Sequence, residues 1–247
     1  MNFLTLPSPD KYEYNHHTRT DPHRRASGLS DIILGGQDGL VNVLGVILGV
    51  AAASGDPRIV LAAGLAATFA ESVSMGAVAY TSTLADSDVY QSEMAREHRH
   101  IRCVPSLEKQ EIRDIYQRKG FQDSLLDQIV DTITANPDVW VAVMMAEEHQ
   151  LSPVSRGTAI RSALIVGGSA IVGSIIPLAP FIFLPIALGS WVSIAISALT
   201  LFVVGVLKAR ATVGHPGRSG LEMAVIGTIS ALVGYAVGAL FKVPVTP

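Results

Sequence analysis

The sequence has few charged residues for its length. Only 16% of its 247 residues are Asp, Glu, Lys or Arg, whereas a soluble globular domain carries about 25%. None occurs between Ser162 and Leu207, a stretch of about 46 residues that is long enough for two membrane crossings of about 20 residues each. We therefore predict a membrane protein rather than a water-soluble enzyme.

Other scarcities exclude further classes of protein. The single cysteine, Cys103, leaves no partner for an intrachain disulfide. A net charge of -3 gives no basic surface of the kind that binds nucleic acid, so no nucleic-acid partner is expected. Residues 1–25 are polar and contain proline, and they lack the apolar core of a signal peptide. They are expected to form a cytosolic tail.

Five apolar segments have the length and composition of membrane helices. The first is followed by the sequence SGDP (54–57), in which Asp56 is suited to cap the next helix and Pro57 to begin it. In the second segment no proline occurs between Pro57 and Pro105, and no glycine occurs between Gly76 and Pro105. Its helix is therefore expected to extend beyond the bilayer. The expected crossings lie near residues 32–53, 57–84, 161–176, 183–207 and 221–241.

Basic residues predict the orientation, because cytosolic loops carry an excess of Lys and Arg. They gather before the first crossing, between the second and third, and between the fourth and fifth. Outside the charge-rich segment between the second and third crossings, these are Arg19, Arg24, Arg25, Lys208, Arg210 and Arg218. These regions fall on one face of the membrane. The N-terminus is therefore expected in the cytosol and the C-terminus in a lumen or outside the cell.

The segment between the second and third crossings is expected to fold as a small domain of three helices. Residues 85–161 hold 13 of the 21 acidic residues. Helices are predicted at 106–120, at 123–135 and from Asn136-Pro137 through residue 150. The predicted fold class is thus all-α: a polytopic membrane protein with five transmembrane helices and a cytosolic three-helix domain. The expected divisions are a cytosolic tail (1–28), helices one and two (29–84), the domain (85–155) and helices three to five (156–247).

Carboxylates in this domain recur three or four residues apart, which places them on common helix faces. The candidate metal ligands come in three sets, namely Glu97 with His100, Glu108 with Glu111, and Met144 and Met145 with Glu148. Carboxylate and imidazole suit iron, manganese, cobalt and zinc, and a thioether is a softer donor than calcium or magnesium uses. The alternative is a solvated acidic face, with the methionines packed in a core.

Two carboxylates and a thioether lie within the apolar segments. Asp38 and Glu71 each place an ionisable group where burial in lipid costs at least about 2.5–3.5 kcal/mol, which by default indicates a functional site. Met75 lies one turn beyond Glu71 on the same face of its helix. We predict an intramembrane site for metal and protons. The alternatives are a structural hydrogen bond between helices for the carboxylates and simple packing for Met75.

Four stretches resemble the vacuolar iron transporter family, in its plant-like and bacterial type with a soluble metal-binding domain. They are DGLVNVLGVILGVAAA (38–53), AGLAATFAESVSMGAVAYTS (63–82), EIRDIYQRKGF (111–121) and VMMAEEHQL (143–151). The resemblance implies a homodimer that moves ferrous iron and related divalent ions out of the cytosol in exchange for protons. It implies a location in a vacuolar membrane or a bacterial inner membrane.

The resemblance also assigns roles to particular residues. The glutamates of the family's soluble domain fall on Glu97, Glu108, Glu111 and Glu148, and its methionines fall on Met144 and Met145. Its intramembrane residues fall on Asp38 and Met75, with Glu71 nearby. His100 stands where the family pattern has a glutamate, so the cluster has one negative charge fewer when the imidazole binds metal. Glu93, Glu147 and His149 are candidate supplementary ligands, with solvated surface as the favoured alternative.

The resemblance implies a dimer, and the spacing of small residues in two of the apolar segments gives weak support for one. They recur at four-residue intervals in the first and fifth segments, at Gly35, Gly39, Gly45, Gly49, Gly234 and Gly238. Such spacing lets membrane helices approach closely. Because five helices are few to enclose a polar path, we predict a path at a dimer axis lined by the first helix.

The leading functional hypothesis is a proton-coupled antiporter for Fe²⁺, with Mn²⁺, Co²⁺ and Zn²⁺ as further ions. It has no catalytic residues and no prosthetic group. The alternative is a membrane-bound ferritin-like di-iron oxidase, because Glu97 and His100 form a Glu-x-x-His pattern. That fold needs a second copy of the pattern, and neither Glu147 nor Glu148 is followed by a histidine three residues later. A metal sensor or storage protein is a third possibility, and metal flux into proteoliposomes would separate it from a transporter.

Overall fold

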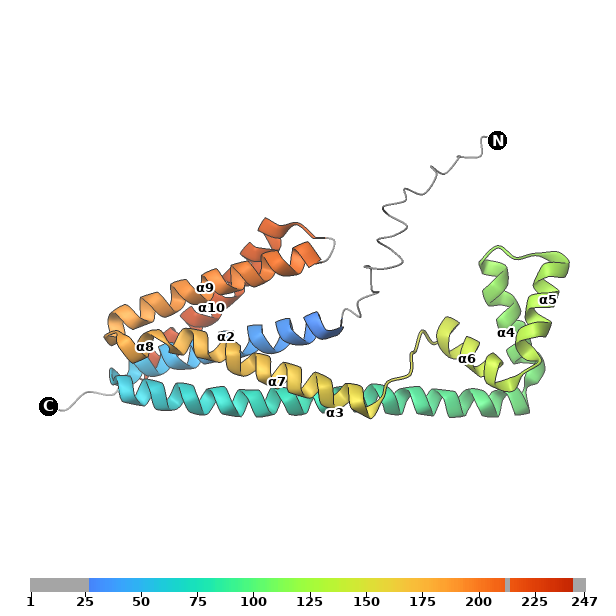
Figure 1. Cartoon of the computed structure of the whole chain (residues 1–247), viewed down its shortest axis with the longest axis horizontal. Helices are drawn as coiled ribbons and strands as arrows, with labels where there is room; N and C mark the ends of the chain where they lie inside the picture. Colours follow the sequence, from blue (N-terminus) through green and yellow to red (C-terminus); the bar gives the residue numbers. More distant parts are fainter. Residues whose placement is uncertain (1–26, 212–213, 242–247) are drawn as a thin grey trace, which may run out of the picture.

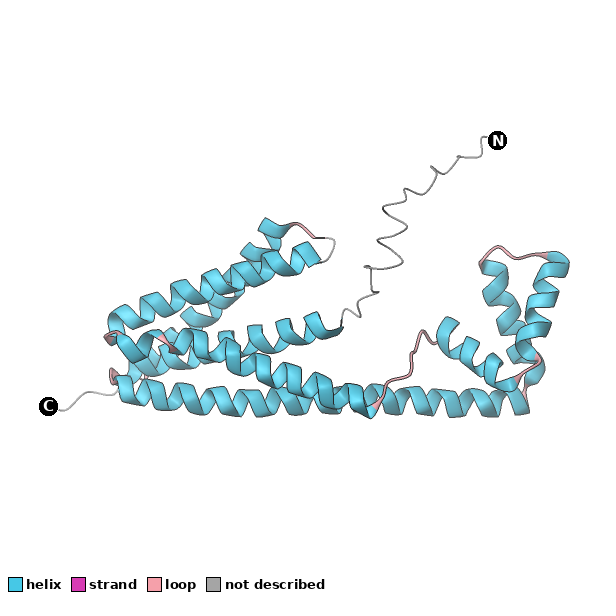
Figure 2. Ribbon diagram, in the orientation of Figure 1, coloured by secondary structure: helices cyan, strands magenta, loops and turns pink. Residues whose placement is uncertain are grey.

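The computed structural model describes residues 27–211 and 214–241, and every regular element in these ranges is a helix (Figure 2). Five helices are long and apolar enough to cross a membrane, which confirms the expected all-helical fold with five candidate spans. They are α2 (Ser27–Ser54), α3 (Pro57–Cys103), α7 (Arg156–Leu178), α9 (Ile186–Ala211) and α10 (Pro216–Leu240). The predicted tail up to residue 26, with its basic residues, and the chain beyond residue 241 lie outside the described residues.

Capping residues set the helix boundaries where the sequence predicted them. The Asp56 side chain accepts a hydrogen bond from the backbone N–H of Arg58 at 2.8 Å, and Pro57 is the first residue of α3. Asn136 caps α6 (Pro137–Glu147) in the same way, accepting from the N–H of Asp138 at 2.9 Å. In both cases a side-chain oxygen satisfies one of the N–H groups that a helix start leaves unpaired.

The helix α3 is a single helix of 47 residues. At 1.5 Å per residue its length is about 70 Å, more than twice the roughly 30 Å of hydrocarbon in a bilayer. As expected for a segment without proline after Pro57 and without glycine after Gly76, α3 is one continuous helix. It extends far beyond the other spans (Figure 1).

The helix α2 forms the centre of the bundle, where it packs against α3, α7 and α10. Its residues Leu44, Ile47 and Leu48 are fully buried. They form one apolar cluster with Val60 of α3 and Leu178 at the end of α7. The short helix α8 (Pro180–Phe183) follows α7 and turns the chain back into α9.

Glycines allow α2 to approach its neighbours within the same chain. A Cβ atom added at Gly238 of α10 would lie 1.9 Å from the carbonyl oxygen of Gly49, and one at Gly39 would lie 2.3 Å from that of Ala170 in α7. The backbones therefore touch at these points, as small residues permit. The glycine spacing that we connected with a dimer axis serves packing inside one chain, so it gives no support to a contact between subunits.

Three helices form a separate unit around the far end of α3, which we call the α4–α6 unit: α4 (Pro105–Arg118), α5 (Asp123–Thr134) and α6. Its apolar core contains Ile112, Val130, Trp140 and Met144, with Ile101 of α3 packed against it. The helix bounds agree with the prediction, except that the third helix ends at Glu147 rather than near residue 150.

The α4–α6 unit projects from one end of the bundle (Figure 1). The starts of α2, α7 and α10 and the end of α9 lie at that end, whereas the turns joining α2 to α3 and α7 to α9 lie at the other (Figure 1). The charge-rich segment and the basic residues Lys208, Arg210 and Arg218 therefore share one side of the bundle.

Candidate metal centre

Glu97 is the central residue of the candidate site. It lies on α3 beyond the membrane-spanning part, about 33 Å along the helix axis from Met75. Its side chain is almost wholly buried, with the residue 2% exposed. Glu93, Glu97 and His100 are four and three residues apart, so one face of α3 carries all three.

The turn at Val104 brings the start of α4 alongside α3 and places Glu108 in the first turn of the new helix. Glu108 is also only 2% exposed. His100 joins the two glutamates, since its Nδ1 atom lies 3.2 Å from Oε1 of Glu108 and 3.9 Å from Oε1 of Glu97. Ligand atoms of these three residues lie within 4.8 Å of one another, a spacing that could hold a metal ion.

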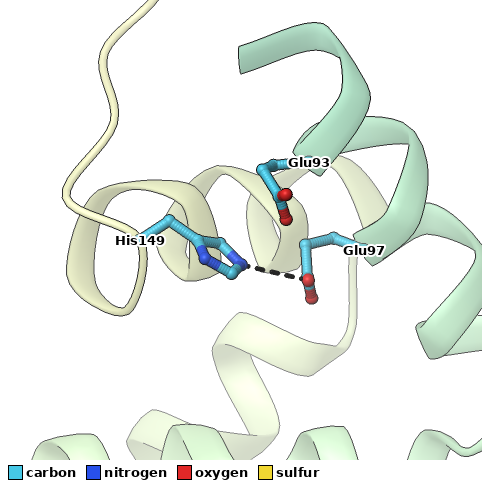
Figure 3. A group of neighbouring side chains, drawn as sticks. All are labelled: Glu93, Glu97 and His149. Carbon is cyan, nitrogen blue, oxygen red and sulfur yellow. Dashed lines mark hydrogen bonds and ion pairs between the residues drawn. The ribbon is translucent and has the colours of Figure 1, made fainter. Parts of the chain in front are cut away.

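A second histidine approaches Glu97 from the segment after α6. Glu148 follows the last helical residue, and Gln150 has a positive φ of 54°, so the chain turns sharply at this point. His149 thereby points back toward α3, and its Nε2 atom lies 3.1 Å from Oε1 of Glu97 (Figure 3). Glu93 completes a second group whose ligand atoms lie within 4.8 Å of one another.

Burial and like charge act on the carboxylates of this cluster. Burial raises the pKa of Glu108 to about 7, and the nearby carboxylates of Glu111, Glu97 and Glu148 add to the effect. The pKa of Glu148 is raised too, chiefly by burial and then by Glu111. The pKa values of Glu108 and Glu148 therefore both respond to the charges of two other predicted residues, Glu97 and Glu111.

The cluster suits a divalent cation for a second reason. Oε2 of Glu97 and Oε2 of Glu108 are both buried and have no hydrogen-bond partner among the described residues. An unpaired buried carboxylate oxygen is costly, and a metal ion between these residues would remove that cost. The donor set of carboxylates and imidazoles suits iron, manganese, cobalt and zinc.

The two methionines and Glu147 occupy different surroundings. Met144 and Met145 are fully buried, and Met144 is part of the apolar core with Ile112 and Trp140. Packing therefore accounts for Met144, and a ligand role for either thioether stays a prediction. Glu147 pairs with Lys119 at 2.5 Å, which gives it a partner in α4's C-terminal loop.

The intramembrane carboxylates meet between α2 and α3. The side-chain amide of Asn42 donates a hydrogen bond to Oε1 of Glu71 at 3.1 Å, and the side chain of Asp38 interacts with that of Glu71. Met75 is half-buried one turn further along α3. The next residue after Glu71, Ser72, donates to the carbonyl oxygen of Gly167 in α7 at 2.9 Å.

Sequence reasoning missed two residues of these groups. Asn42 was not named as a candidate, although its position four residues after Asp38 puts both on one face of α2. Arg96 was not considered, yet it pairs with Glu93 at 2.6 Å and lies 3.8 Å from Glu97. The spacing of three residues between Glu93 and Arg96 was a signal for their pairing, because such residues are neighbours on a helix, whereas adjacent residues such as Arg96 and Glu97 ordinarily diverge.

Comparisons with known proteins agree with this architecture. The model of the VIT family matches residues 29–239. The chain is 32% identical over 227 residues to "Vacuolar iron transporter 1" of Tulipa gesneriana, covering 92% of this chain and 90% of that protein. It is 31% identical over 234 residues to the protein of the same name from Oryza sativa subsp. japonica, covering 94% and 93%.

A third relative gives a similar match. The chain is 30% identical over 243 residues to "Vacuolar iron transporter" of Plasmodium falciparum, covering 94% of this chain and 87% of that protein. The match to the family model includes all five candidate spans and the α4–α6 unit. This multi-pass membrane protein therefore belongs to the VIT family.

Proposed function

We propose that the protein is a proton-coupled antiporter that moves ferrous iron, and with it manganese, cobalt and zinc, out of the cytosol. The destination is a vacuole or the far side of the cell membrane. The observation that carries the proposal is the meeting of Asp38, Asn42 and Glu71 between the apolar segments of α2 and α3. The relatives are named vacuolar iron transporters, which supports iron as the transported ion and a vacuole as the compartment.

The intramembrane group has the chemistry that such exchange needs. Two neighbouring carboxyl groups can bind a divalent cation when both are ionised, and they can carry protons when the cation leaves. An ionisable residue in a membrane span is costly, and such residues mark ion pathways and proton relays. Asp38 and Glu71 are therefore the residues that we assign to coupling, with Met75 as a further metal contact on the same face of α3.

Orientation follows from the distribution of basic residues. The end of the bundle that carries the α4–α6 unit also carries Lys208, Arg210 and Arg218, and an excess of such residues is typical of the cytosolic side. We therefore place the α4–α6 unit in the cytosol as a metal-capturing domain and the end of α10 on the far side. The carboxylates of this domain concentrate cations at the entrance to the membrane path.

A homodimer is part of the proposal. The hydrogen bond between Asn42 and Glu71 lies at the exposed surface of a single chain. Polar groups of this kind are unfavourable against lipid. A second copy packed on this face would shield them and would complete the walls of a polar path.

The decisive experiment is uptake of Fe²⁺ into proteoliposomes with and without an imposed pH gradient, repeated with Mn²⁺, Co²⁺ and Zn²⁺. We expect a gradient that is acidic on the destination side to drive uptake, and we expect metal entry to raise the pH of that side. Uptake that is indifferent to the gradient would contradict antiport. A purified monomer with full transport activity would contradict the homodimer.

A further inference from the structure

We propose that Glu93, Glu97 and His149 form a second ion subsite, adjacent to the one formed by Glu97, His100 and Glu108. The inference rests on the proposed role of the α4–α6 unit as a metal-binding domain and adds to it a site with its own ligands. The ligand class is a borderline divalent ion such as Fe²⁺, Co²⁺ or Zn²⁺, because an imidazole donor suits these ions better than magnesium or calcium.

The geometry of the three side chains supports a site. Glu93 and Glu97 lie one turn apart on α3, and His149 faces them from the turn after α6 (Figure 3). One ligand atom from each residue lies within 4.8 Å of the others. Three donors from two chain segments converge, which a single acidic helix face would not provide.

Glu97 links the two subsites. Its Oε1 atom faces both histidines, 3.1 Å from Nε2 of His149 and 3.9 Å from Nδ1 of His100, while its Oε2 atom is buried without a hydrogen-bond partner. A carboxylate has two oxygens and accepts on both, so Glu97 is placed to bridge two ions. Bridged ions in proteins lie about 3.5–4 Å apart.

Arg96 holds the position that the second ion would take. Its guanidinium pairs with Glu93 at 2.6 Å and lies 3.8 Å from Oε1 of Glu97, while 43% of its side chain is exposed. The exposed side chain can turn into solvent when a cation arrives. Arg96 thus balances the charge of the carboxylates before the ion binds and competes with the ion afterwards.

The position of the subsite suggests its use. Glu93 is one helical turn, or about 6 Å, nearer the membrane than Glu97. An ion that first binds to Glu97, His100 and Glu108 could pass to the second subsite without losing contact with Glu97. The shared carboxylate makes the second subsite the next position on the way toward α3's membrane-spanning part.

The test is a titration of the full chain in detergent with Co²⁺, in which calorimetry measures binding and X-ray absorption measures the distance between bound ions. We expect the wild type to show Co–Co scattering at about 3.5–4 Å. His149→Leu should lose that signal and one Co²⁺ per chain, whereas the neighbouring control His98→Leu should keep both. Arg96→Gln should bind the second ion about tenfold more tightly, because a competing positive charge is gone.

The possible results separate this inference from the proposed function. If His149→Leu binds as many Co²⁺ ions as the wild type with the same affinity, His149 is only a hydrogen-bond partner of Glu97 and the subsite is refuted. If the wild type binds Co²⁺ but gives no Co–Co signal, the bridged pair is refuted while metal capture stands. If the wild type binds no Co²⁺, the capture role of the α4–α6 unit fails as well. The wild-type measurements do not depend on the folding of any variant.

Discussion

Asn42 on α2 and Glu71 on α3 are joined by a hydrogen bond of 3.1 Å between the apolar segments of these helices. Asp38, one turn before Asn42 on α2, interacts with the same glutamate. The three residues form a polar bridge between the two spans, and transport by this protein should depend on each of them in a different way.

The first prediction concerns Asp38. Asp38→Asn keeps the size of the side chain but removes its charge and its ability to take up a proton, so uptake driven by a pH gradient should fall to the level of protein-free liposomes. The measurement is Fe²⁺ uptake into proteoliposomes. Asp31→Asn, the same change two turns earlier on α2, is the control and should transport normally. Wild-type flux in Asp38→Asn would remove Asp38 from the mechanism.

The second prediction concerns Asn42. Asn42→Leu deletes the donor to Glu71 and should reduce the maximal rate of uptake by about ten- to a hundredfold, since a lost hydrogen bond to a charged group costs about 1.5–3 kcal/mol. Asn42→Gln retains an amide donor and should recover part of the rate. Equal rates for Leu and Gln at this position would show that the hydrogen bond is irrelevant to transport.

A third prediction separates metal capture from translocation. Replacing Glu108, Glu111 and Glu148 together with Gln should weaken Co²⁺ binding and slow uptake at scarce iron, because the carboxylates no longer concentrate cations. At saturating iron this variant should retain more flux than Asp38→Asn. Glu147→Gln is the control, because Glu147 pairs with Lys119. Equal loss at every iron concentration would make the domain part of the gate.

The fourth prediction uses the raised pKa of Glu108, which burial and neighbouring carboxylates bring to about 7 from an ordinary 4.5. Below this pKa a cation must displace a proton, so Co²⁺ affinity should fall as the pH is lowered from about 8 to about 6. Calorimetry in buffers of different ionisation enthalpy should detect proton release near pH 6. Glu108→Gln should release fewer protons and show a shallower pH dependence.

The same pKa has a consequence for stability. Because the folded chain binds this proton more tightly than the unfolded chain, the contribution of Glu108 should stabilise the metal-free fold at pH below about 4.5 and diminish as the pH rises toward about 7. Thermal unfolding of the full chain should show this trend, and Glu108→Gln should weaken it. If the stability of the wild type, but not that of Glu108→Gln, rises as the pH is raised from about 4.5 to about 7, the assignment is contradicted.

The fifth prediction tests the contact between α2 and α10. Gly238→Ala would place a Cβ atom 1.9 Å from the carbonyl oxygen of Gly49, so the helices must separate and the melting temperature in detergent should fall. Gly168→Ala is the matched control, because its Cβ would meet nothing within 4 Å. It should leave stability unchanged or raise it by up to about 1 kcal/mol, since alanine favours a helix. Equal effects at both positions would show that the close approach is unimportant.

The sequence was a good guide to features that depend on local chemistry. Asp56 and Asn136 were recognisable as caps because each precedes a proline that begins a helix. The continuity of α3 followed from the lack of glycine and proline after Gly76. These signals depend on a few neighbouring residues, and later packing does not override them.

Features that depend on long-range packing were less predictable. Glycine spacing showed that helices approach closely, but the partners of Gly39 and Gly49 turned out to lie in α7 and α10 of the same chain. The contact of His149 with Glu97 spans 52 residues and requires the turn at Gln150, whose positive φ is unusual for a residue other than glycine. Helical spacing could not indicate either.

The length of α3 has a mechanical consequence. The helix is one continuous rod, so any change in its tilt is transmitted along its whole length, and Glu97 lies about 33 Å beyond Met75 along its axis. A change in tilt of about 10° would move Glu97 sideways by about 6 Å. The hydrogen bond from Ser87 of α3 to the carbonyl oxygen of Val154 links the segment before α7 to the same helix. Bilayer thickness, which influences helix tilt, would thereby set how far the metal centre stands from the entrance of the membrane path.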